Sequence, residues 1–225
     1  MTATTTTTRA LSRTQKLLMS ITAIGVTASM AGLGSFATFT DTESGSTPID
    51  SGIVSMSVGA DGTADNRMSV AATDIVPGDT IERAVKLTVD STTTSTLGSI
   101  KLTTQAKKAD GTVHSSKLDT DVTNGLQMLI KRCAVAWTEA GTAPGYTYTC
   151  PNDAAGASQE TSVLASRAII GADLDLSSAL GLTAGTTNHL LVKVNLPTTA
   201  DNTFQNVAST VTYSFTGTQR AATNK

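Results

Sequence analysis

The chain has 225 residues and a formal net charge of −2. That length allows one domain of ordinary size, or two small ones, with a full hydrophobic core. The slight acidity and the lack of a Lys/Arg stripe exclude the electrostatic footprint of a nucleic-acid-binding protein. Threonine fills roughly one position in five. Because β-branched residues fit the half-solvated surface of a pleated sheet, the composition indicates an all-β domain.

The beginning of the chain has the organisation of a secretory signal. Basic residues precede an uncharged apolar run over residues 17–33. Small side chains follow at Ser35 and Ala37, as the shallow pockets of a signal peptidase require. We therefore expect a signal peptide over residues 1–37, cut between Ala37 and Thr38. An uncleaved membrane anchor is the alternative.

A polar segment over residues 38–51 follows the expected cleavage site. It contains Gly45 and Pro48, few large apolar side chains and no core pattern of its own. Its simplest interpretation is a flexible leader. No second long apolar run occurs later in the sequence. We expect a secreted, extracellular or cell-surface protein that touches the membrane only through the uncleaved signal and meets a signal peptidase during export.

The remaining sequence alternates between strand patterns and turn signals. A Pro77-Gly78 pair favours a turn, since Pro presets φ and Gly accepts a positive φ. Residues 125–137 are apolar on both faces, which is typical of a central strand. Period-2 alternation predicts further strands over residues 54–58, 81–89, 100–106, 146–150, 190–196 and 207–215.

Helical patterns are few and short. Residues 173–182 have an apolar spacing that fits one short helix, and residues 200–206 favour a tight or helical turn. Many short strands with little helix predict a jelly-roll-like β-sandwich with short helical insertions over residues 52–220. Residues 221–225 are expected to be a flexible tail. The edge strands of such a sheet are templates for another strand.

Two cysteines, Cys133 and Cys150, lie on segments that are able to pair across a hairpin. An exported protein meets oxidising conditions, so a disulfide is the expected state. Closing a loop of that length contributes on the order of 3 kcal/mol when the bridge is unstrained. A pair of free, reactive thiols is the alternative.

No catalytic or metal-binding constellation stands out. The two histidines, His114 and His189, belong to no HExxH motif, and no GxSxG motif or P-loop occurs. Asp61 and Asp65 are similar to part of a calcium loop but lack its remaining ligands, so a plain turn is the simpler interpretation. The sequence predicts no cofactor, no bound metal and no enzymatic activity.

Three stretches together resemble the TasA/camelysin family of secreted biofilm-matrix proteins. The first is the junction GSFATFTDTESG, which begins at Gly34. The second is IVPGDTIER over residues 75–83, similar to the turn and strand of that family. The third is LPTTADNTFQN over residues 196–206, followed by the closing pattern VTYSFTGTQ. Each motif is weak alone, but their order is specific.

The resemblance implies a jelly-roll sandwich that is cut by a specialised signal peptidase and assembles into extracellular fibres. In such fibres, the freed N-terminal segment adds as a strand to a neighbouring copy. The candidate donor residues here, with Phe39 as the side chain expected to dock, are Thr38, Phe39, Thr40, Asp41 and Thr42. Partners would be further copies or paralogous matrix subunits. A camelysin-like cell-surface metalloendopeptidase and a non-polymerising adhesin are the alternatives.

Overall fold

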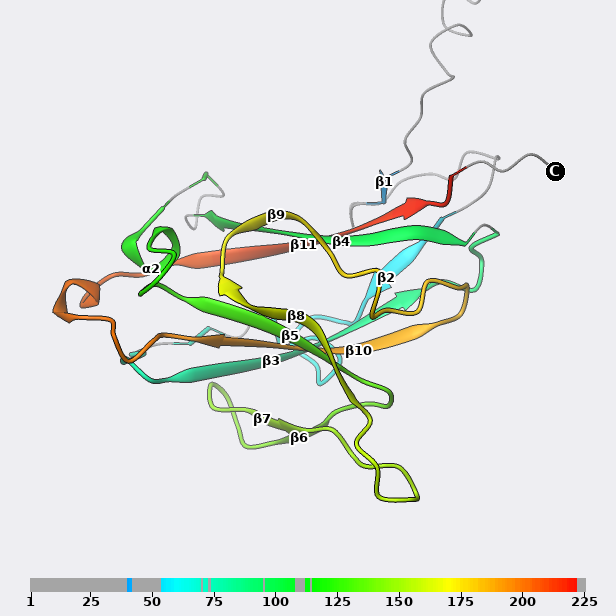
Figure 1. The fold of residues 1–225 in the computed structure, drawn as a ribbon, viewed down its shortest axis with the longest axis horizontal. Coiled ribbons are helices and arrows are strands. Elements are labelled where there is room, and N and C mark those ends of the chain that lie inside the picture. Colours follow the sequence, from blue (N-terminus) through cyan, green and yellow to red (C-terminus); the bar gives the residue numbers. More distant parts are fainter. Residues whose placement is uncertain are drawn as a thin grey trace, which may run out of the picture. The chain divides into compact units, whose positions relative to one another are not determined.

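The computed structural model describes residues 40–41, 54–69, 71–72, 74–94, 96–107, 112–113 and 115–221. These residues form two facing antiparallel sheets and a small hairpin outside them (Figure 1). The first sheet contains, in spatial order, β1 (Thr40–Asp41), β11 (Thr210–Gln219), β4 (Leu97–Lys107) and β9 (Gly171–Asp175).

The second sheet is larger. In spatial order it contains β2 (Met56–Val58), β3 (Thr80–Val89), β10 (Thr187–Asn195), β5 (Gln127–Cys133) and β8 (Glu160–Ala168). Strand β10 lies between β3 and β5, so neighbours in space are distant in sequence. This crossing order is that of a Greek key. The predicted all-β, jelly-roll-like sandwich is therefore confirmed.

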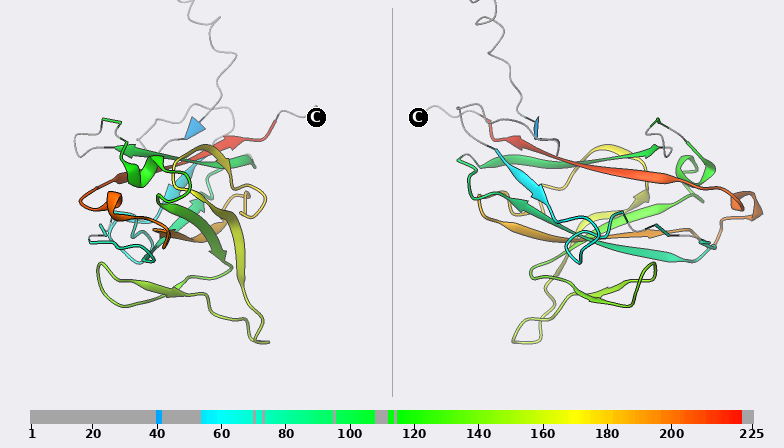
Figure 2. Two further views of the ribbon diagram at one scale, coloured as in Figure 1. Left: turned by 60° about the vertical axis from the view of Figure 1, so that its left-hand side comes forward. Right: turned by 180° about the vertical axis from the view of Figure 1, so that it is seen from behind.

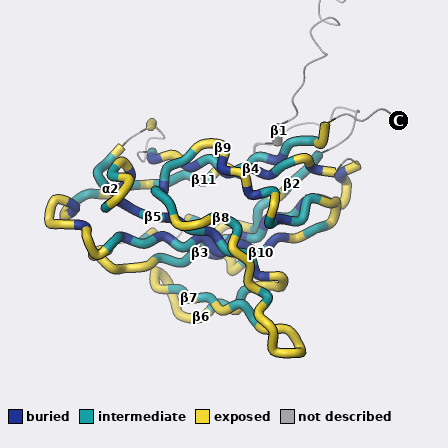
Figure 3. Tube along the Cα trace, viewed as in Figure 1, coloured by how far each residue is buried: buried dark blue, intermediate teal, exposed yellow. Residues whose placement is uncertain are grey.

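The core lies between the two sheets (Figure 3). On β3, alternate residues from Val85 to Val89 are at most 1% exposed, and β10 contributes Leu190 and Val192 in the same way. Facing them from the other sheet are Ile100 and Leu102 of β4 and Phe215 of β11, all buried. The period-2 pattern of these segments places every second side chain on one face, which is why the sequence gives sheets and not helices.

The third sheet is a hairpin on the outer side of the five-stranded sheet (Figure 2). It consists of β6 (Thr138–Ala140) and β7 (Thr147–Thr149). Its two ends are joined by the disulfide between Cys133 and Cys150, 17 residues apart. The expected disulfide is thus present, and it fixes the end of the hairpin, directly after β7, to the end of β5.

Among the described residues, two short helical turns connect the strands. The predicted helical turn near residues 200–206 is confirmed as η2 (Asn202–Phe204), where Asp201 accepts a hydrogen bond from the Thr203 amide at 2.9 Å. A second helix, α2 (Lys117–Thr120), was not predicted. Its signal is the Ser116–Asp119 spacing of a capping box, in which the Ser116 amide donates to the Asp119 carboxylate at 3.0 Å.

Two sequence expectations were wrong. Residues 173–182 do not form a helix, because Leu174 lies in β9, which pairs with β4, and a turn follows at Ser177. The spacing of apolar residues there fits both the helical period of 3.6 and the strand period of 2. The pairing with β4 determines that the segment is a strand. Residues 160–168 form strand β8, which is missing from the predicted strands. Two register shifts against β5 hide their alternation.

Candidate functional site

Strand β11 has one long edge with few partners. Its inner edge pairs with β4 in unbroken register from Thr210 to Thr218. Among the described residues, its outer edge pairs only through Gly217 and Thr218, which face β1. Unpaired backbone N–H and C=O groups at a sheet edge are a template for another strand. The outer edge of β11 is therefore a ready acceptor for an extended chain.

A groove opens beside this edge, between the amino-terminal halves of β3 and β11. Its volume is about 870 Å³. Ile81 and Arg83 line it from β3, Val211 and Tyr213 from β11, and the described parts of residues 68–76 also border it. Most of this lining is apolar, and Val76 at its rim is 56% exposed. The groove thus offers an apolar surface directly next to the partly paired backbone edge.

Arg83 is the positively charged residue of the groove, which Asp74 also borders. It is 5% exposed, although it stands in the register position of a core residue on β3. Its guanidinium donates to the carbonyl oxygens of Glu82 at 2.8 Å, Pro144 at 3.2 Å and Ala71 at 3.5 Å. Burial lowers the pKa of the Arg83 guanidinium from its ordinary value, because water is removed from around the charge. In the sequence, its charge stands at an apolar position of the alternating pattern over residues 81–89.

Tyr213 faces the groove from β11. Burial raises the pKa of its hydroxyl well above the ordinary value, and the nearby positive charge of Arg83 opposes that rise. The hydroxyl therefore stays protonated and is a hydrogen-bond donor. Together, Arg83 and Tyr213 place a guanidinium and a hydroxyl in a cleft whose lining is mostly apolar, which is a typical way to orient a bound chain.

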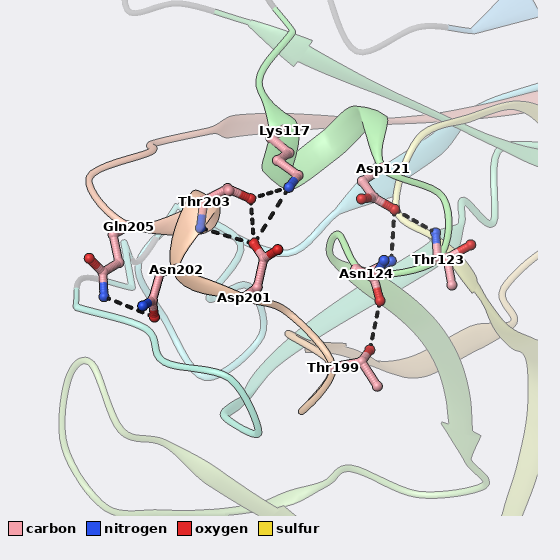
Figure 4. A network of polar contacts seen from close by, with 9 residues as sticks. All are labelled: Lys117, Asp121, Thr123, Asn124, Thr199, Asp201, Asn202, Thr203 and Gln205. Carbon is pink, nitrogen blue, oxygen red and sulfur yellow. Dashed lines mark hydrogen bonds and ion pairs between the residues drawn. The ribbon is translucent and has the colours of Figure 1, made fainter.

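The end wall of the groove is built by α2 and η2, which lie side by side (Figure 4). The Nζ of Lys117 approaches the Asp201 carboxylate to 3.6 Å and stands 4.3 Å from the centre of the Phe204 ring. Thr199 donates to the Asn124 side chain at 2.8 Å, which fixes the chain before η2 to the loop after α2. Phe204 itself is buried, so η2 closes this end of the core.

Two of the sequence motifs meet at this groove. In the Pro77-Gly78 turn, Gly78 has a φ of +99°, and its amide donates to the carbonyl of Leu196 at 2.8 Å. The Leu196 amide in turn donates to the Asp79 carbonyl at 3.1 Å. The predicted turn is confirmed, and it is joined to the segment that leads to η2. Motifs more than a hundred residues apart therefore frame one site.

On the far side of the five-stranded sheet, the hairpin is held by a small polar cluster. Arg67 approaches the Glu139 carboxylate to 2.7 Å and lies 4.6 Å from the centre of the Tyr146 ring. The Tyr148 hydroxyl donates to Glu139 at 2.8 Å. The hydrogen bond from Arg67, more than any other contact, lowers the pKa of Glu139. The indole N–H of Trp137 donates to the carbonyl of His189 at 3.0 Å.

The predicted site residues fall partly within the described chain. Thr40 and Asp41 form β1 and pair with β11. Ala37, Thr38, Phe39 and Thr42 lie outside the described residues, as do the expected signal peptide and the last four residues of the tail. Of the described helices, none is long and apolar enough to cross a membrane.

The fold and the disulfide define a disulfide-bonded all-β sandwich of the kind found among exported proteins. Residues 12–130, just over half of the chain, match the family described as camelysin metallo-endopeptidase. The chain belongs to this family, which includes the TasA-like proteins. Proteins of the family are extracellular or surface-associated, and this chain is a secreted or cell-surface protein of that kind. No curated protein sequence matches it.

The family description implies a metal ion, and the described residues do not fit one. In that part of the chain, no three side chains of His, Cys, Asp or Glu are grouped to hold a metal. Both cysteines are committed to the disulfide, and His114 lies outside the described residues. His189 is partly buried in β10, where desolvation lowers its pKa. Asp65 forms an ion pair with Lys86, so its carboxylate serves the loop in which it stands.

Proposed function

We propose that this protein is a secreted structural subunit, or an accessory component, of extracellular matrix filaments. After cleavage between Ala37 and Thr38, residues 38–47 of one copy add as a strand to β11 of the next. Backbone hydrogen bonds give such a contact its affinity, and pockets for alternate side chains give it specificity. The donor segment and the acceptor edge are different surfaces, so the contact is heterologous and continues into an open filament.

One observation carries the proposal: β1 and β11 are already an antiparallel pair. Thr40 is opposite Thr218 and Asp41 is opposite Gly217. The residues next to the expected cleavage site are therefore compatible in register and direction with this edge. A second copy that supplies the same residues would form the same ladder, and it would extend over the rest of β11.

The composition of β11 supports its use as an acceptor. The strand reads TVTYSFTGTQ and contains no charged residue. Its register against β4 is regular over nine residues, so its outer edge is straight. Proteins that avoid strand addition place charges, prolines or bulges on their edges, and this strand has none of these along its outer edge before Thr218.

Electron microscopy of the secreted form tests the proposal. We expect an N-terminal residue of Thr38 in the mature protein and filaments in the preparation. A variant that lacks residues 38–47 is expected to keep its fold, checked by circular dichroism, and to remain monomeric. Filaments from the shortened variant would contradict strand donation. Folded protein that stays monomeric with residues 38–47 present would favour a non-polymerising adhesin.

We also propose that the role of this chain is structural and not enzymatic. The support is chemical: among the described residues, no group of three His, Cys, Asp or Glu side chains is assembled that could hold a metal ion. The family description nevertheless motivates a direct test. Purified secreted protein should leave casein intact, with and without added zinc. Cleavage that a chelator abolishes would establish the metalloendopeptidase instead.

A further inference from the structure

The hairpin of β6 and β7 depends on attachments outside itself (Figure 2). Each of its strands has three residues, and a two-stranded hairpin alone is at best marginally stable in water. The indole N–H of Trp137 donates to a carbonyl of β10, and the Tyr148 amide donates to the Glu82 carboxylate at 3.1 Å. The disulfide between Cys133 and Cys150, 17 residues apart, closes the loop that contains the hairpin. Because this bridge limits the freedom that a released hairpin would gain, it contributes much of the attachment.

A short segment next to the hairpin forms part of the groove. Met68, Ser69, Ala71 and Ala72 line it, and we call these four residues and Arg67 the groove wall. The Arg67 amide donates to a carbonyl of β3 at 2.9 Å, and beyond it no backbone–backbone hydrogen bond between described residues joins the wall to a strand. Met68 packs against the core, whereas Ser69 and Ala71 are exposed. The position of the wall therefore depends strongly on the side chains that hold it.

Two arginines join the groove wall to the hairpin. Arg67 presents Nε and Nη2 to the two carboxylate oxygens of Glu139 on β6, at 3.0 and 2.7 Å. Arg83 donates to the carbonyl of Ala71 in the wall at 3.5 Å, and to that of Pro144 in the hairpin turn at 3.2 Å. The wall and the hairpin are therefore connected at two points.

The contact between Arg67 and Glu139 is the stronger of these two joints. Its two nitrogens meet two oxygens, which is the bidentate geometry of a charge-assisted pair. Each side chain is 18% exposed, so salt screens the pair less than it would at an open surface. The Tyr148 hydroxyl also donates to Glu139 and so orients the carboxylate. If the hairpin left the sheet, the wall would lose both joints at once, because Glu139 and Pro144 would move with it.

We propose that the Cys133–Cys150 bridge is a redox-sensitive clamp on the groove. When the bridge is closed, the hairpin stays on the sheet and holds the groove wall in place through Arg67 and Arg83. When a thiol reduces the bridge, the hairpin is released, the wall loses both joints and the groove beside β11 opens. Every contact of the clamp lies within one copy, so the clamp goes beyond the proposed function and does not depend on strand donation.

Thiol–disulfide exchange supplies the chemistry of the clamp. Cys133 is 1% exposed and Cys150 is the more accessible of the two, so the Sγ of Cys150 is the point of attack. A thiolate bonds to this sulfur, the S–S bond breaks, and Cys133 leaves as a thiolate that takes up a proton. A second thiol then displaces the first from Cys150. Two small thiols are thereby oxidised to one disulfide, and the bridge is reduced to two thiols.

Hydrogen exchange of the full secreted chain, followed by mass spectrometry, tests the clamp. The amides of the groove wall should exchange at least about tenfold faster after reduction with dithiothreitol than in the oxidised protein. The amides of β4, in the other sheet, should exchange at the same rate in both forms. Trp137 is the only tryptophan, and its fluorescence should change as the hairpin is released. Reduced protein in which β4 stays protected and the wall exchanges as slowly as before would overturn the proposal.

Variants with the bridge closed decide the question if reduction unfolds the whole sandwich. Glu139→Ala removes the carboxylate that Arg67 binds, so the groove wall should exchange at least about threefold faster. Lys131→Ala is the matched control, because it removes a pair with Glu160 at 2.6 Å that lies on β5 and β8 and not on the hairpin. This control should leave the exchange of the wall unchanged. Equal exchange in Glu139→Ala and the unmodified chain, or equal acceleration by both variants, would overturn the proposal.

Discussion

The two long edge strands of the sandwich, β11 and β8, are built in opposite ways. Strand β8 shifts register twice against β5 and carries charges at Glu160 and Arg167. Lys131 contacts Glu160 at 2.6 Å across the ladder. Strand β11 is uncharged and runs in regular register from Thr210 to Thr218. A groove of about 870 Å³ lies beside β11.

The difference shows that this sandwich protects one edge and leaves the other available. Register shifts and charges discourage a second chain from adding to a sheet. A straight Thr-rich edge next to an apolar groove has none of these obstacles. The short β2 and the irregular β9, in which Asp173 has a φ of +52°, are also poor templates. Among the described strands, β11 is the edge suited to assembly.

Placing a charge on β11, like the charges that β8 carries, should have the largest effect on filament formation. Val211→Lys places a charge on the groove side of the edge, and we expect it to abolish filaments because docking would bury that charge. Thr212→Lys is the control, since it adds the same charge on the opposite face of the strand. Both proteins should keep their circular dichroism spectra. If Val211→Lys formed filaments at the normal critical concentration, the uncharged edge of β11 would not be what permits assembly.

Removing the disulfide should weaken the protected side. In the ladder, Cys133 is opposite Glu160 of β8, so the bridge stabilises the end of that edge. For a loop of this length, Cys133→Ser with Cys150→Ser should lower the free energy of unfolding by about 3 kcal/mol. Urea unfolding of the variant measures the loss, and the unmodified protein with and without reductant is the control. An unchanged midpoint would show that the hairpin contacts alone hold this side.

Shortening Phe39 should have a smaller effect on assembly. In the proposed register it falls at the far end of β11 from the groove, opposite Gln219. Phe39→Ala removes apolar contact from the donor segment and should raise the critical concentration about tenfold. Light scattering against protein concentration measures this. Unchanged assembly would mean that the groove end of the segment carries the binding.

Mild acid should lower the stability of the sandwich without changing the charge of β11, the proposed acceptor edge. Burial lowers the folded-state pKa of His189 below its ordinary value of 6.5. The unfolded chain therefore takes up the proton first, and stability falls as pH drops from 6.5 through the folded-state pKa. His189→Gln should reduce the fall in melting temperature between pH 7 and pH 5. Strand β11 carries no group that titrates between pH 7 and 5. If the melting temperature of His189→Gln changed with pH as steeply as that of the unmodified protein, another group would be responsible for the pH dependence.

Much of this fold is readable from the sequence because strand alternation is a strong local signal. Residues 81–89, apart from Arg83, and residues 190–196 alternate cleanly, and both are strands close to their predicted bounds. Strand β8 is not readable, since its register shifts interrupt the alternation. For residues 173–182 the apolar spacing fits two periods, and only the pairing of β9 with β4 distinguishes them.

The site is less readable than the fold. The sequence singles out the donor residues, and Thr40 and Asp41 prove to pair with β11. It does not reveal the acceptor, because the groove depends on how β3, β11 and η2 pack together. Arg83 gives a weak signal as a charge at a core position of an alternating strand. Its meaning depends on Tyr213 and Pro144, which are distant in sequence and near in space.

Cross-linking between two different variants tests most directly whether the edge of β11 binds the segment of another copy. In the proposed contact, the register of Thr40 and Asp41 continued along β11 would put Ser44 of one copy opposite Ser214 of the next. Protein carrying Ser44→Cys, mixed with protein carrying Ser214→Cys, should form disulfide-linked heterodimers in filaments under mild oxidation. The offset pair Ser44→Cys and Thr212→Cys should form far fewer. Folded protein that yields no heterodimer, or equal amounts from both pairs, would contradict strand donation in this register.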